Sequence, residues 1–466
     1  MLFTTLEYWI FFFVVFVLYH LLAHRAQNLM LLVASYVFYA AWDWRYAGLM
    51  ALSTAIAYGA GLAVEDHRAG HRRRAALTSA VVANLAVLAA FKYWGFIVDV
   101  IGDLLNPGAD FYDNISLSVL LPVGISFYTF QSISYVVDVA RGEIRAARNP
   151  LDLALYVSLF PQLVAGPIER GAQLMPQVIN RRPVNLPAMR SALWLIAWGL
   201  YKKICIADTL AHPVNAVFAT SDPTGPEVYV AAVCFALQIY CDFSGYTDIA
   251  RGCARLIGFE LMLNFNLPYI ARNPSDFWRR WHISLSTWLR DYLYIPLGGS
   301  RRGPGRTTFN LMATMVLGGL WHGARYNFIL WGAYHGAILV AHRVISGRLT
   351  GRGSRLGIVL SVLVMFQFTL FGWLLFRVET IEQLSRMMGA LATGWSSAGV
   401  AGDILLYALP TTVPLLFIEA WQVRASRLDV VERSPWPVHV ALVSLALAAA
   451  VILDRSGAAP FIYFQF

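Results

Sequence analysis

The chain has 466 residues, of which 58% are hydrophobic and only 14% are charged. An ordinary soluble domain carries roughly 25% charged residues, so this composition excludes a soluble protein and predicts an all-α polytopic membrane protein. The net charge of +9 does not indicate nucleic-acid binding, because the basic residues fall in short gaps between apolar segments. In such gaps they set the membrane topology and contact anionic lipids.

The apolar segments predict the membrane helices. A helix needs about 20 apolar residues to cross the hydrocarbon core, and because several segments are short or interrupted we expect roughly nine to twelve spans. The first segment lacks the basic start and the cleavage site of a secretory signal, so we expect it to be a span. In chain order the segments lie near residues 6–24, 28–44, 46–64, 77–101, 115–139, 151–165, 189–207, 227–241, 307–321, 326–346, 357–377, 404–420 and 437–453.

The loops after the first five segments differ in charge. Residues 65–74 and 140–149 each contain several arginines, whereas residues 102–114 contain aspartates and no lysine or arginine. Cytoplasmic loops of membrane proteins carry an excess of lysine and arginine. This alternation therefore places the two basic loops in the cytoplasm and the N-terminus outside.

Neither a disulfide framework nor a metal site is predicted. His20 and His24 share an i, i+4 spacing, but a metal site needs three or four ligands at a recognisable spacing. The cysteines form no CxxC pair, and we expect them to pack inside helices. They lie in or beside apolar segments, at Cys205, Cys234, Cys241 and Cys253.

Residues 160–171 read FPQLVAGPIERG, in which two prolines and a glycine interrupt an apolar segment. A broken helix at membrane depth is typical of a tunnel wall or gate. A span that ends at the membrane interface on a proline has the same pattern, so both interpretations stay open.

Residues 241–306 form neither a clean span nor a soluble domain, because aromatic residues, arginines and aspartates are interleaved. Irregular backbone at membrane depth must be buried in protein or line a wet cavity. We therefore expect re-entrant or interfacial helices around a cavity in this segment.

One helix of this segment is expected to begin at Asp276, with Ser275 as its cap. Arg279 and Arg280 lie off its aromatic face, and His282 follows closely. An interfacial helix with aromatic and arginine anchors explains the pattern, but the added histidine and two nearby serines indicate a site. The aromatic face contains Trp278, Trp281, Leu285 and Trp288.

His322 lies in GGLWHGARYNFILWG, residues 318–332, where Arg325 is the only formal charge. An ionisable group at membrane depth is costly, so it tends to be functional or paired, and a neutral imidazole suits a general base. A structural, hydrogen-bonded histidine fits the same pattern. The flanking glycines permit either close helix packing or close approach of a ligand.

The buried ionisable residues are consistent with a transport function. Asp242, Asp248 and His322 together suit a proton relay, as in a proton-coupled transporter.

Residues 239–303, IYCDFSGYTDIARGCARLIGFELMLNFNLPYIARNPSDFWRRWHISLSTWLRDYLYIPLGGSRRG, resemble the signature of the membrane-bound O-acyltransferase (MBOAT) family. The likeness is closest to its bacterial alginate O-acetylase branch, whose second motif resembles LGGLWHGARYNFILWGAYHG, residues 317–336. The segments FYTFQSISYVVDVARG, FPQLVAGPIER and PFIYFQF are also similar, and the resemblance covers nearly the whole chain.

The resemblance implies a helical membrane core with re-entrant or interfacial helices around a through-membrane tunnel. A cytoplasmic acyl thioester, acetyl-CoA in this branch, is expected as the donor substrate, with no bound cofactor. The protein would be a multi-pass protein of the bacterial inner membrane. The acceptor would be an exported polymer such as alginate, cellulose, peptidoglycan or teichoic acid, reached through periplasmic or outer-face partner proteins.

The expected organisation is one membrane domain over residues 1–466. Within it we expect N-terminal helices over 1–150, a catalytic core with the motifs over 151–350, and C-terminal helices with an aromatic tail over 351–466.

The resemblance also assigns roles. His322 matches the family's catalytic histidine, and His282 matches a position that is asparagine in many eukaryotic members. Acyl transfer to a hydroxyl needs a base and a donor to the developing oxyanion. Neutral His322 suits the base, and His282 either orients the thioester or donates to its carbonyl. Further candidates for donor binding or for the tunnel wall are Trp281, Trp321, Arg279, Arg280, Asp242 and Ser244.

The arginines and the terminal FIYF each allow a second interpretation. The arginines would bind donor phosphates, or they serve only as positive-inside topology signals. The terminal FIYF, residues 461–464, is either an aromatic interface anchor or similar to a carrier motif of the teichoic acid D-alanylation system. In the second case Tyr463 would carry the acyl group on its hydroxyl.

Overall fold

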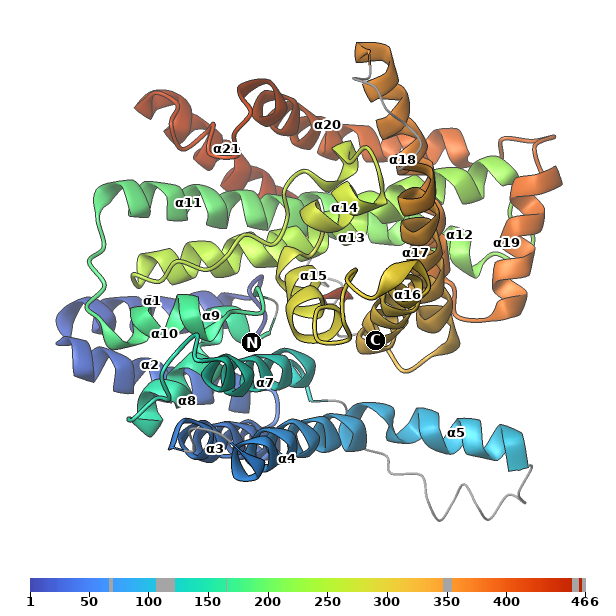
Figure 1. Cartoon of the computed structure of the whole chain (residues 1–466). Helices are drawn as coiled ribbons and strands as arrows, with labels where there is room; N and C mark the ends of the chain where they lie inside the picture. Colours follow the sequence, from blue (N-terminus) through green and yellow to red (C-terminus); the bar gives the residue numbers. More distant parts are fainter. Residues whose placement is uncertain (67–69, 106–121, 165, 347–353, 455–460, 463–466) are drawn as a thin grey trace. The chain divides into compact units, whose positions relative to one another are not determined.

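The computed structural model, drawn in Figure 1, describes residues 1–66, 70–105, 122–164, 166–346, 354–454 and 461–462. All elements within these ranges are helical, which confirms the all-α prediction. Tyr463 lies outside the described residues. The fold separates into two compact units: Met1–Met189 with Cys253–Met262, and Arg190–Gly252 with Leu263–Phe466.

The first unit begins at the N-terminus. Its helices are α1 (Leu6–Leu21), α2 (His24–Ala40), α3 (Trp44–Asp66), α4 (His71–Leu88), a π-helical turn (Ala89–Tyr93), α5 (Trp94–Leu105), α7 (Ile125–Arg141), α8 (Pro150–Ser158), α9 (Phe160–Leu163) and α10 (Gly171–Ile179).

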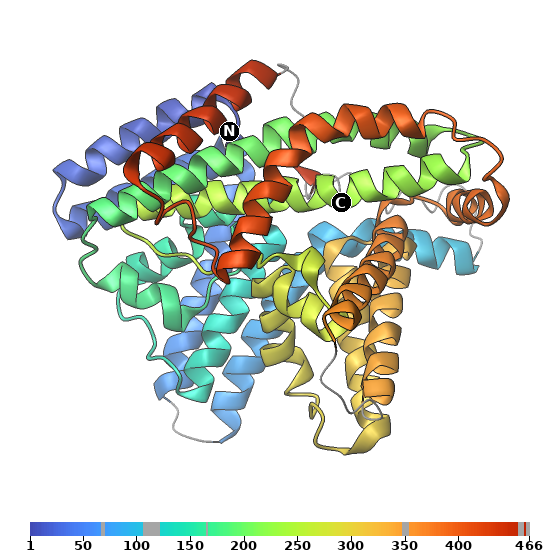
Figure 2. The ribbon, with the colours of Figure 1, turned by 90° about the horizontal axis from the view of Figure 1, so that it is seen from above.

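Helices α3, α4 and α7 of this unit lie side by side, as Figure 2 shows. Small and polar side chains fill their contact: Ser53 Oγ donates to Asn84 Oδ1 at 2.6 Å. A Cβ at Gly61 of α3 would lie 2.9 Å from the ring of Tyr135 on α7. Small residues and interhelical hydrogen bonds are how helices associate in lipid, where the hydrophobic effect does not drive them together.

The helix break predicted over residues 160–171 is present. Helix α9 is a single turn, and the described residues between it and α10 are not helical. The side-chain amides of Gln131 and Gln162 both donate to the Tyr156 carbonyl oxygen, at 2.7 and 2.8 Å. Because Glu169 in this segment is fully buried, the break lies inside protein, which favours the tunnel-wall interpretation over a span that ends at the interface.

The second unit holds the remaining helices, except that the last residues of α13 (Gly225–Leu256), from Cys253 onward, belong to the first unit. They are α11 (Leu186–Leu200), whose first turn belongs to the first unit, a π-helical segment (Tyr201–Asp208), α12 (Thr209–Ala219), α13 (Gly225–Leu256), a 3-10 turn (Pro268–Ile270), α14 (Pro274–Arg280), α15 (Ile283–Leu289), a π-helical turn (Arg290–Tyr294), α16 (Gly303–His322), α17 (Tyr326–Ser346), α18 (Arg355–Arg377), α19 (Ile381–Thr393), α20 (Ala401–Ala425) and α21 (Trp436–Leu453).

Helix α13 is longer than predicted. The apolar pattern ends near residue 241, but the helix continues to Leu256 through acidic and small residues. It crosses α11 in backbone contact, since a Cβ at Gly199 would lie 2.6 Å from the Gly245 carbonyl oxygen. This crossing brings two lysines that follow α11 next to the acidic residues of α13, and charge pairing lets the buried helix continue.

The glycines around His322 pack helices and do not leave space for a ligand. A Cβ at Gly319 of α16 would lie 2.1 Å from the Phe328 carbonyl oxygen of α17, and a Cβ at Gly323 would lie 2.2 Å from the Phe328 ring. Gly332 of α17 approaches the α16 backbone just as closely. Of the two interpretations of these glycines, close helix packing is therefore correct, and room for a ligand such as an acyl thioester is wrong.

Seven helices in the described ranges are long and apolar enough to cross a membrane. The predicted range was higher because it counted shorter apolar segments such as α1, which has 16 residues. The qualifying helices, with α4 and α5 read as one, are Trp44–Asp66, His71–Gly102, Gly225–Leu256, Tyr326–Ser346, Arg355–Arg377, Ala401–Ala425 and Trp436–Leu453.

Candidate active site

The segment predicted as one helix from Asp276 onward is two short helices with a break at His282. The cap of α14 is Asn273, whose Oδ1 accepts the Asp276 N–H at 2.9 Å, and not Ser275. The backbone of His282 has φ = 43°, in the left-handed region that side chains other than glycine seldom occupy. The predicted continuous aromatic face is therefore wrong beyond Arg280.

Asn264 holds this unusual turn. Its Oδ1 accepts hydrogen bonds from the Ser284 N–H at 3.2 Å and from the Ser284 hydroxyl at 2.9 Å. Its backbone carbonyl accepts the Ile283 N–H at 2.9 Å. The side chains of Asn264, His282 and Ser284 are all fully buried. The turn is thus fixed by one amide side chain that sequence analysis did not identify.

Asn264 also determines the tautomer of His282. The imidazole Nδ1 lies 3.2 Å from Asn264 Oδ1, and because that atom already accepts a backbone N–H it must be the amide oxygen. Nδ1 therefore carries the proton, and Nε2 has the lone pair. Burial lowers the pKa of His282 to about 3, so the ring is neutral at physiological pH.

His322 ends α16 inside an enclosure of aromatic rings. Its ring centroid lies 5.1 Å from Trp321, 5.1 Å from Trp331 and 5.5 Å from Phe376. The ring of His282 lies 6.3 Å away, and both histidines are buried. The second unit therefore brings the two predicted catalytic residues into one cluster.

The two predicted tunnel tryptophans differ in position. The Trp321 ring contacts both histidines, at 5.9 Å from His282 and 5.1 Å from His322. The Trp281 ring packs into the core instead, with centroids 4.7 Å from Trp373 and 4.9 Å from Phe265. Of the two, Trp321 is the one that borders the histidine pair.

The two predicted donor-binding arginines also differ. Arg280 is committed to local structure, because its Nε donates to Asp276 Oδ1 at 2.9 Å and its Nη1 donates to the Asn266 carbonyl at 3.2 Å. Arg279 is exposed, and its Nε donates to the Ser275 carbonyl at 3.2 Å. Arg279 is therefore the more exposed of the two side chains.

Asp242 belongs to a buried ion cluster. The ammonium of Lys203 lies 2.8 Å from Asp242 Oδ1 and 2.7 Å from Asp208 Oδ1, and the Lys203 side chain is only 1% exposed. Lys203 comes from the π-helical segment and Asp242 from α13, so the cluster joins the two elements. Burying such a cation without an acidic partner would be strongly destabilising.

Ser244 belongs to a neighbouring cluster. Lys202 Nζ donates to Ser244 Oγ at 2.9 Å and to Asp248 Oδ2 at 2.6 Å. Sequence analysis did not identify either lysine as a site residue. Two adjacent lysines inside an apolar segment, YKKICIAD, are nevertheless a signal for buried acidic partners.

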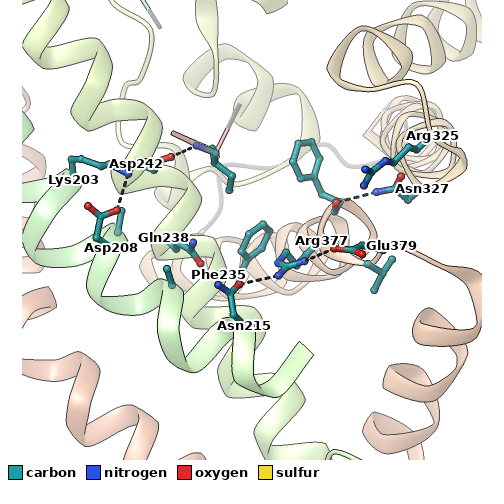
Figure 3. A pocket seen from close by; sticks show the side chains of 15 residues that line it. Lys203, Asp208, Asn215, Phe235, Gln238, Asp242, Arg325, Asn327, Arg377 and Glu379 are labelled. Atoms are coloured by element: carbon teal, nitrogen blue, oxygen red, sulfur yellow. Dashed lines mark hydrogen bonds and ion pairs between the residues drawn. The ribbon is translucent and has the colours of Figure 1, made fainter. Parts of the chain in front are cut away.

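A polar pocket lies in this unit beside the histidine enclosure (Figure 3). The ion cluster of Lys203 forms one side of the pocket, and Arg325 and Asn327 at the start of α17 lie opposite, near Arg377 and Glu379. Phe376 lines the pocket and also packs against His322. The pocket therefore borders the wall of the histidine enclosure, and Asp242 is the only predicted site residue among its lining residues.

The described end of the chain enters the same region. Ile462 lines the pocket, and its backbone N–H donates to Asp242 Oδ2 at 2.7 Å. The Phe461 ring packs against Tyr246 and Phe243 of α13, at 4.4 and 5.8 Å between centroids. An interface anchor would keep these residues at the surface, whereas both are buried.

The described ranges hold neither a metal-binding cluster nor a disulfide. No group of three or more His, Cys, Asp or Glu side chains is placed there to hold a metal ion. All four cysteines are buried and have free thiols. Their position inside helices agrees with the predicted packing role.

Comparison with known proteins gives matches over most of the chain. The profile of the membrane-bound O-acyltransferase (MBOAT) family matches residues 140–376. The probable alginate O-acetylase AlgI of Azotobacter vinelandii is 38% identical over 96% of this chain and 96% of its own length. The corresponding protein of Pseudomonas aeruginosa is 43% identical over 80% of this chain and 71% of its own.

A third relative has a different named activity. The peptidoglycan O-acetyltransferase of Helicobacter pylori is 33% identical over 79% of this chain and 75% of its own length. The family profile covers both histidines and spans more than half of the chain. The chain therefore belongs to the membrane-bound O-acyltransferase family and is a multi-pass O-acyltransferase of the bacterial inner membrane.

Proposed function

We propose that this enzyme takes an acetyl group from a cytoplasmic thioester, acetyl-CoA, and passes it across the membrane for O-acetylation of an exported polysaccharide, alginate or a similar polymer. The observation that carries the proposal is the buried pair of His282 and His322, whose rings lie 6.3 Å apart. The names of the relatives support the acceptor class, since two are named as probable alginate O-acetylases and one as a peptidoglycan O-acetyltransferase.

His322 acts as the general base in this proposal. Its neutral imidazole takes the proton of the acceptor hydroxyl while the hydroxyl oxygen attacks the thioester carbonyl carbon. The new C–O bond forms, the tetrahedral oxyanion collapses, the C–S bond breaks, and the leaving thiolate takes the proton from the imidazolium. The surrounding aromatic rings exclude water and so protect the thioester from hydrolysis.

His282 has a different part, because its tautomer limits what it can do. With Nδ1–H held by Asn264, Nε2 accepts a hydrogen bond but cannot donate one to an oxyanion. Of the two roles expected from the sequence, this favours orienting the thioester over donating to its carbonyl. An amide N–H of the pantetheine arm is a suitable donor to Nε2.

Removing the Asn264 acceptor is expected to lower turnover by about 10-fold to 100-fold. Asn264→Leu keeps the side-chain volume but leaves the His282 Nδ1–H and the Ser284 N–H and hydroxyl without their acceptor, at about 1–3 kcal/mol for each buried group. The measurement is acetyl-CoA turnover by purified protein, with thermal unfolding as the check on folding. A fully active Asn264→Leu variant would show that the turn does not matter for catalysis.

The two ends of helices α16, α17 and α18 differ in charge, which supports an orientation of these helices in the membrane. One end of these helices holds His322 at the end of α16, Arg325 before α17 and Arg377 at the end of α18. The opposite end holds a larger group of basic residues. By the positive-inside rule the basic ends are cytoplasmic, so the donor enters there and the pocket opens on the outer face. The basic group comprises Arg301, Arg302, Arg306, Arg343 and Arg355.

With this orientation, some charged and polar residues are assigned to binding the donor and others to binding the acceptor. Exposed Arg279 is the proposed contact for donor phosphate, together with the basic group at the start of α16. Arg280, Trp281 and Ser244 support the site through packing and hydrogen bonds. On the outer face, the polar pocket receives the acceptor hydroxyl.

We propose further that Tyr463 carries the acetyl group between His322 and the final acceptor. Tyr463 follows Ile462 in the sequence, and Ile462 lines the pocket. Tyr463→Phe is expected to abolish acetylation of the polymer in cells, because it removes the hydroxyl that would accept the acetyl group. The matched control is Tyr326→Phe, an exposed tyrosine at the start of α17.

Two results of this test separate the carrier from the catalyst. Labelled acetyl-CoA given to purified wild-type protein should leave an ester on the C-terminal peptide, and Tyr463→Phe should leave none. Unchanged polymer acetylation in Tyr463→Phe would rule out the carrier role while leaving the role of His322 intact.

The acceptor and partner proposals have their own test. The peptidoglycan-acetylating relative favours peptidoglycan as a second candidate acceptor. Acetylated alginate and peptidoglycan from a deletion strain, compared with the complemented strain, identify the polymer. Co-purification from the same strain tests for outer-face acetyltransferase partners. We treat residues 1–466 as one acyltransferase domain, because the family-matched segment draws on both units.

A further inference from the structure

Residues 461–462 are the last described residues of the chain and are called the C-terminal segment here; a side-chain carboxylate binds their backbone in a buried setting. The Ile462 N–H donates to Asp242 Oδ2 at 2.7 Å, while the other oxygen of the same carboxylate faces Lys203 at 2.8 Å. Phe461 is fully buried and Ile462 is 4% exposed. A carboxylate that accepts a backbone N–H forms a charge-assisted bond, which is among the stronger hydrogen bonds in proteins.

The charge of the cluster explains why it would bind a backbone segment. Lys203 faces two carboxylates, those of Asp208 and Asp242, so the three groups carry a formal charge of minus one when ionised. The second oxygen of Asp242 needs a hydrogen-bond donor in this buried position. The backbone N–H of Ile462 supplies that donor without adding a charge.

We propose that Asp242 is a positioning residue that anchors the C-terminal segment in the wall of the pocket. The segment is part of the wall, because Ile462 lines the pocket together with Lys203, Asp208 and Asp242. This anchoring role of Asp242 is separate from the acyl-transfer reaction. Its consequence for catalysis rests on the proposed function, in which the residue after Ile462 in the sequence carries the acetyl group.

The anchored segment is linked to the histidine pair by ring contacts. Phe461 packs on Phe243, at 5.8 Å between centroids, and Phe243 packs on His282 at 4.7 Å with the rings perpendicular. The segment is therefore one side chain away from His282. Release of the segment would remove the Phe461 contact from Phe243, which packs on His282.

The chain offers a matched control for the anchor. Asp248 lies on the same helix and pairs with a neighbouring buried lysine, Lys202, at 2.6 Å. The bonds described for Asp248 are to Lys202 of the π-helical segment and to Arg251 of α13. Neither partner belongs to the C-terminal segment. Replacing it removes a comparable ion pair without touching the Ile462 bond.

Hydrogen–deuterium exchange of the full-length protein in nanodiscs measures the anchor directly. In Asp242→Leu the side-chain volume is kept and the acceptor of the Ile462 N–H is lost, while Lys203 keeps Asp208. The C-terminal peptide is expected to exchange at least about tenfold faster than in the wild type, because a protecting hydrogen bond is lost. Asp248→Leu is expected to stay within about twofold of the wild type.

A variant in the segment itself keeps the test valid if Asp242→Leu fails to fold. Ile462→Pro removes the donating N–H and leaves the pocket cluster intact, and Ile462→Ala keeps the N–H. Ile462→Pro should speed exchange of the neighbouring amides as much as Asp242→Leu does, and the double variant should add nothing. Ile462→Ala should not reproduce the effect.

The outcomes distinguish the anchor from the proposed acetyl carrier. If exchange of the C-terminal peptide is already fast in the wild type, or unchanged in Asp242→Leu and Ile462→Pro, the anchor is wrong whatever the activity of Tyr463→Phe. If these variants release the segment while Tyr463→Phe keeps full activity, the anchor stands and the carrier role fails.

Discussion

Replacing His322 with alanine is expected to reduce acetyl transfer about 100-fold to 10,000-fold, since general-base catalysis contributes about 10²- to 10⁴-fold. His282 cannot take its place, because it presents a weakly basic Nε2 whose pKa is lowered to about 3. The assay is release of free thiol from acetyl-CoA by purified protein, together with polymer acetylation in cells.

His335 provides the matched control for this prediction. It is another buried histidine of the aromatic cluster, with its ring 4.7 Å from Trp331, which in turn contacts His322. His335→Gln is expected to keep activity within about tenfold of the wild type, because it perturbs packing and not the base. Equal loss in both variants would mean that the histidines share a structural role, and the base assignment would fail.

Substituting Gly319 with alanine is expected to prevent accumulation of folded protein. The added Cβ would lie 2.1 Å from the Phe328 carbonyl oxygen, and backbone on both sides leaves no flexible side chain to move away. Helices α16 and α17 would have to separate, and overpacking of this kind costs about 1–3 kcal/mol or more. Displacement of His322, which ends the same helix, would follow.

The same helix supplies the control. A Cβ added at Gly305 would meet no neighbouring atom of the described residues within 4 Å, so Gly305→Ala should express at the wild-type level. Size-exclusion chromatography of a fluorescent fusion separates the two cases by the height of the monodisperse peak. A normal peak for Gly319→Ala would show that the α16–α17 contact is looser than the glycine geometry requires.

The helical membrane fold was predictable because it depends on composition and on the length of apolar segments. The break near Pro161 was predictable because Pro161, Gly166 and Pro167 lie close together; isolated prolines do not suffice, since Pro410 and Pro414 lie inside α20. The full length of α13 was not, because its acidic residues end the apolar pattern near residue 241. Only the pairing of those residues with lysines of a distant segment makes the longer helix possible.

The candidate site was predictable only in part. Its two histidines came from resemblance to a family, and their separation of 6.3 Å depends on tertiary structure. Asn264 could not be found from the sequence, because its hydrogen bonds reach across a left-handed turn that no local pattern signals. The glycines near His322 allowed two interpretations, and only the position of Phe328 shows that they pack helices.

The transporter hypothesis drew on the buried aspartates of α13. Asp242 pairs with Lys203 and Asp248 pairs with Lys202, so each carboxylate has a fixed cation and its burial is explained without a proton pathway. Family membership independently assigns the chain to acyltransferases. The aspartates therefore belong to the framework that holds the site and the C-terminal segment.

We propose that an acetyl group crosses the membrane at His322. The most direct test of this proposal uses proteoliposomes in which labelled acetyl-CoA is confined to the cytoplasmic face and an oligomannuronate acceptor, or the protein's own C-terminal peptide, is sampled from the other face. The account predicts that labelled ester appears on the outer face with the wild type and not with His322→Ala. Ester formed with His322→Ala, or found only on the face that holds the donor, would contradict it.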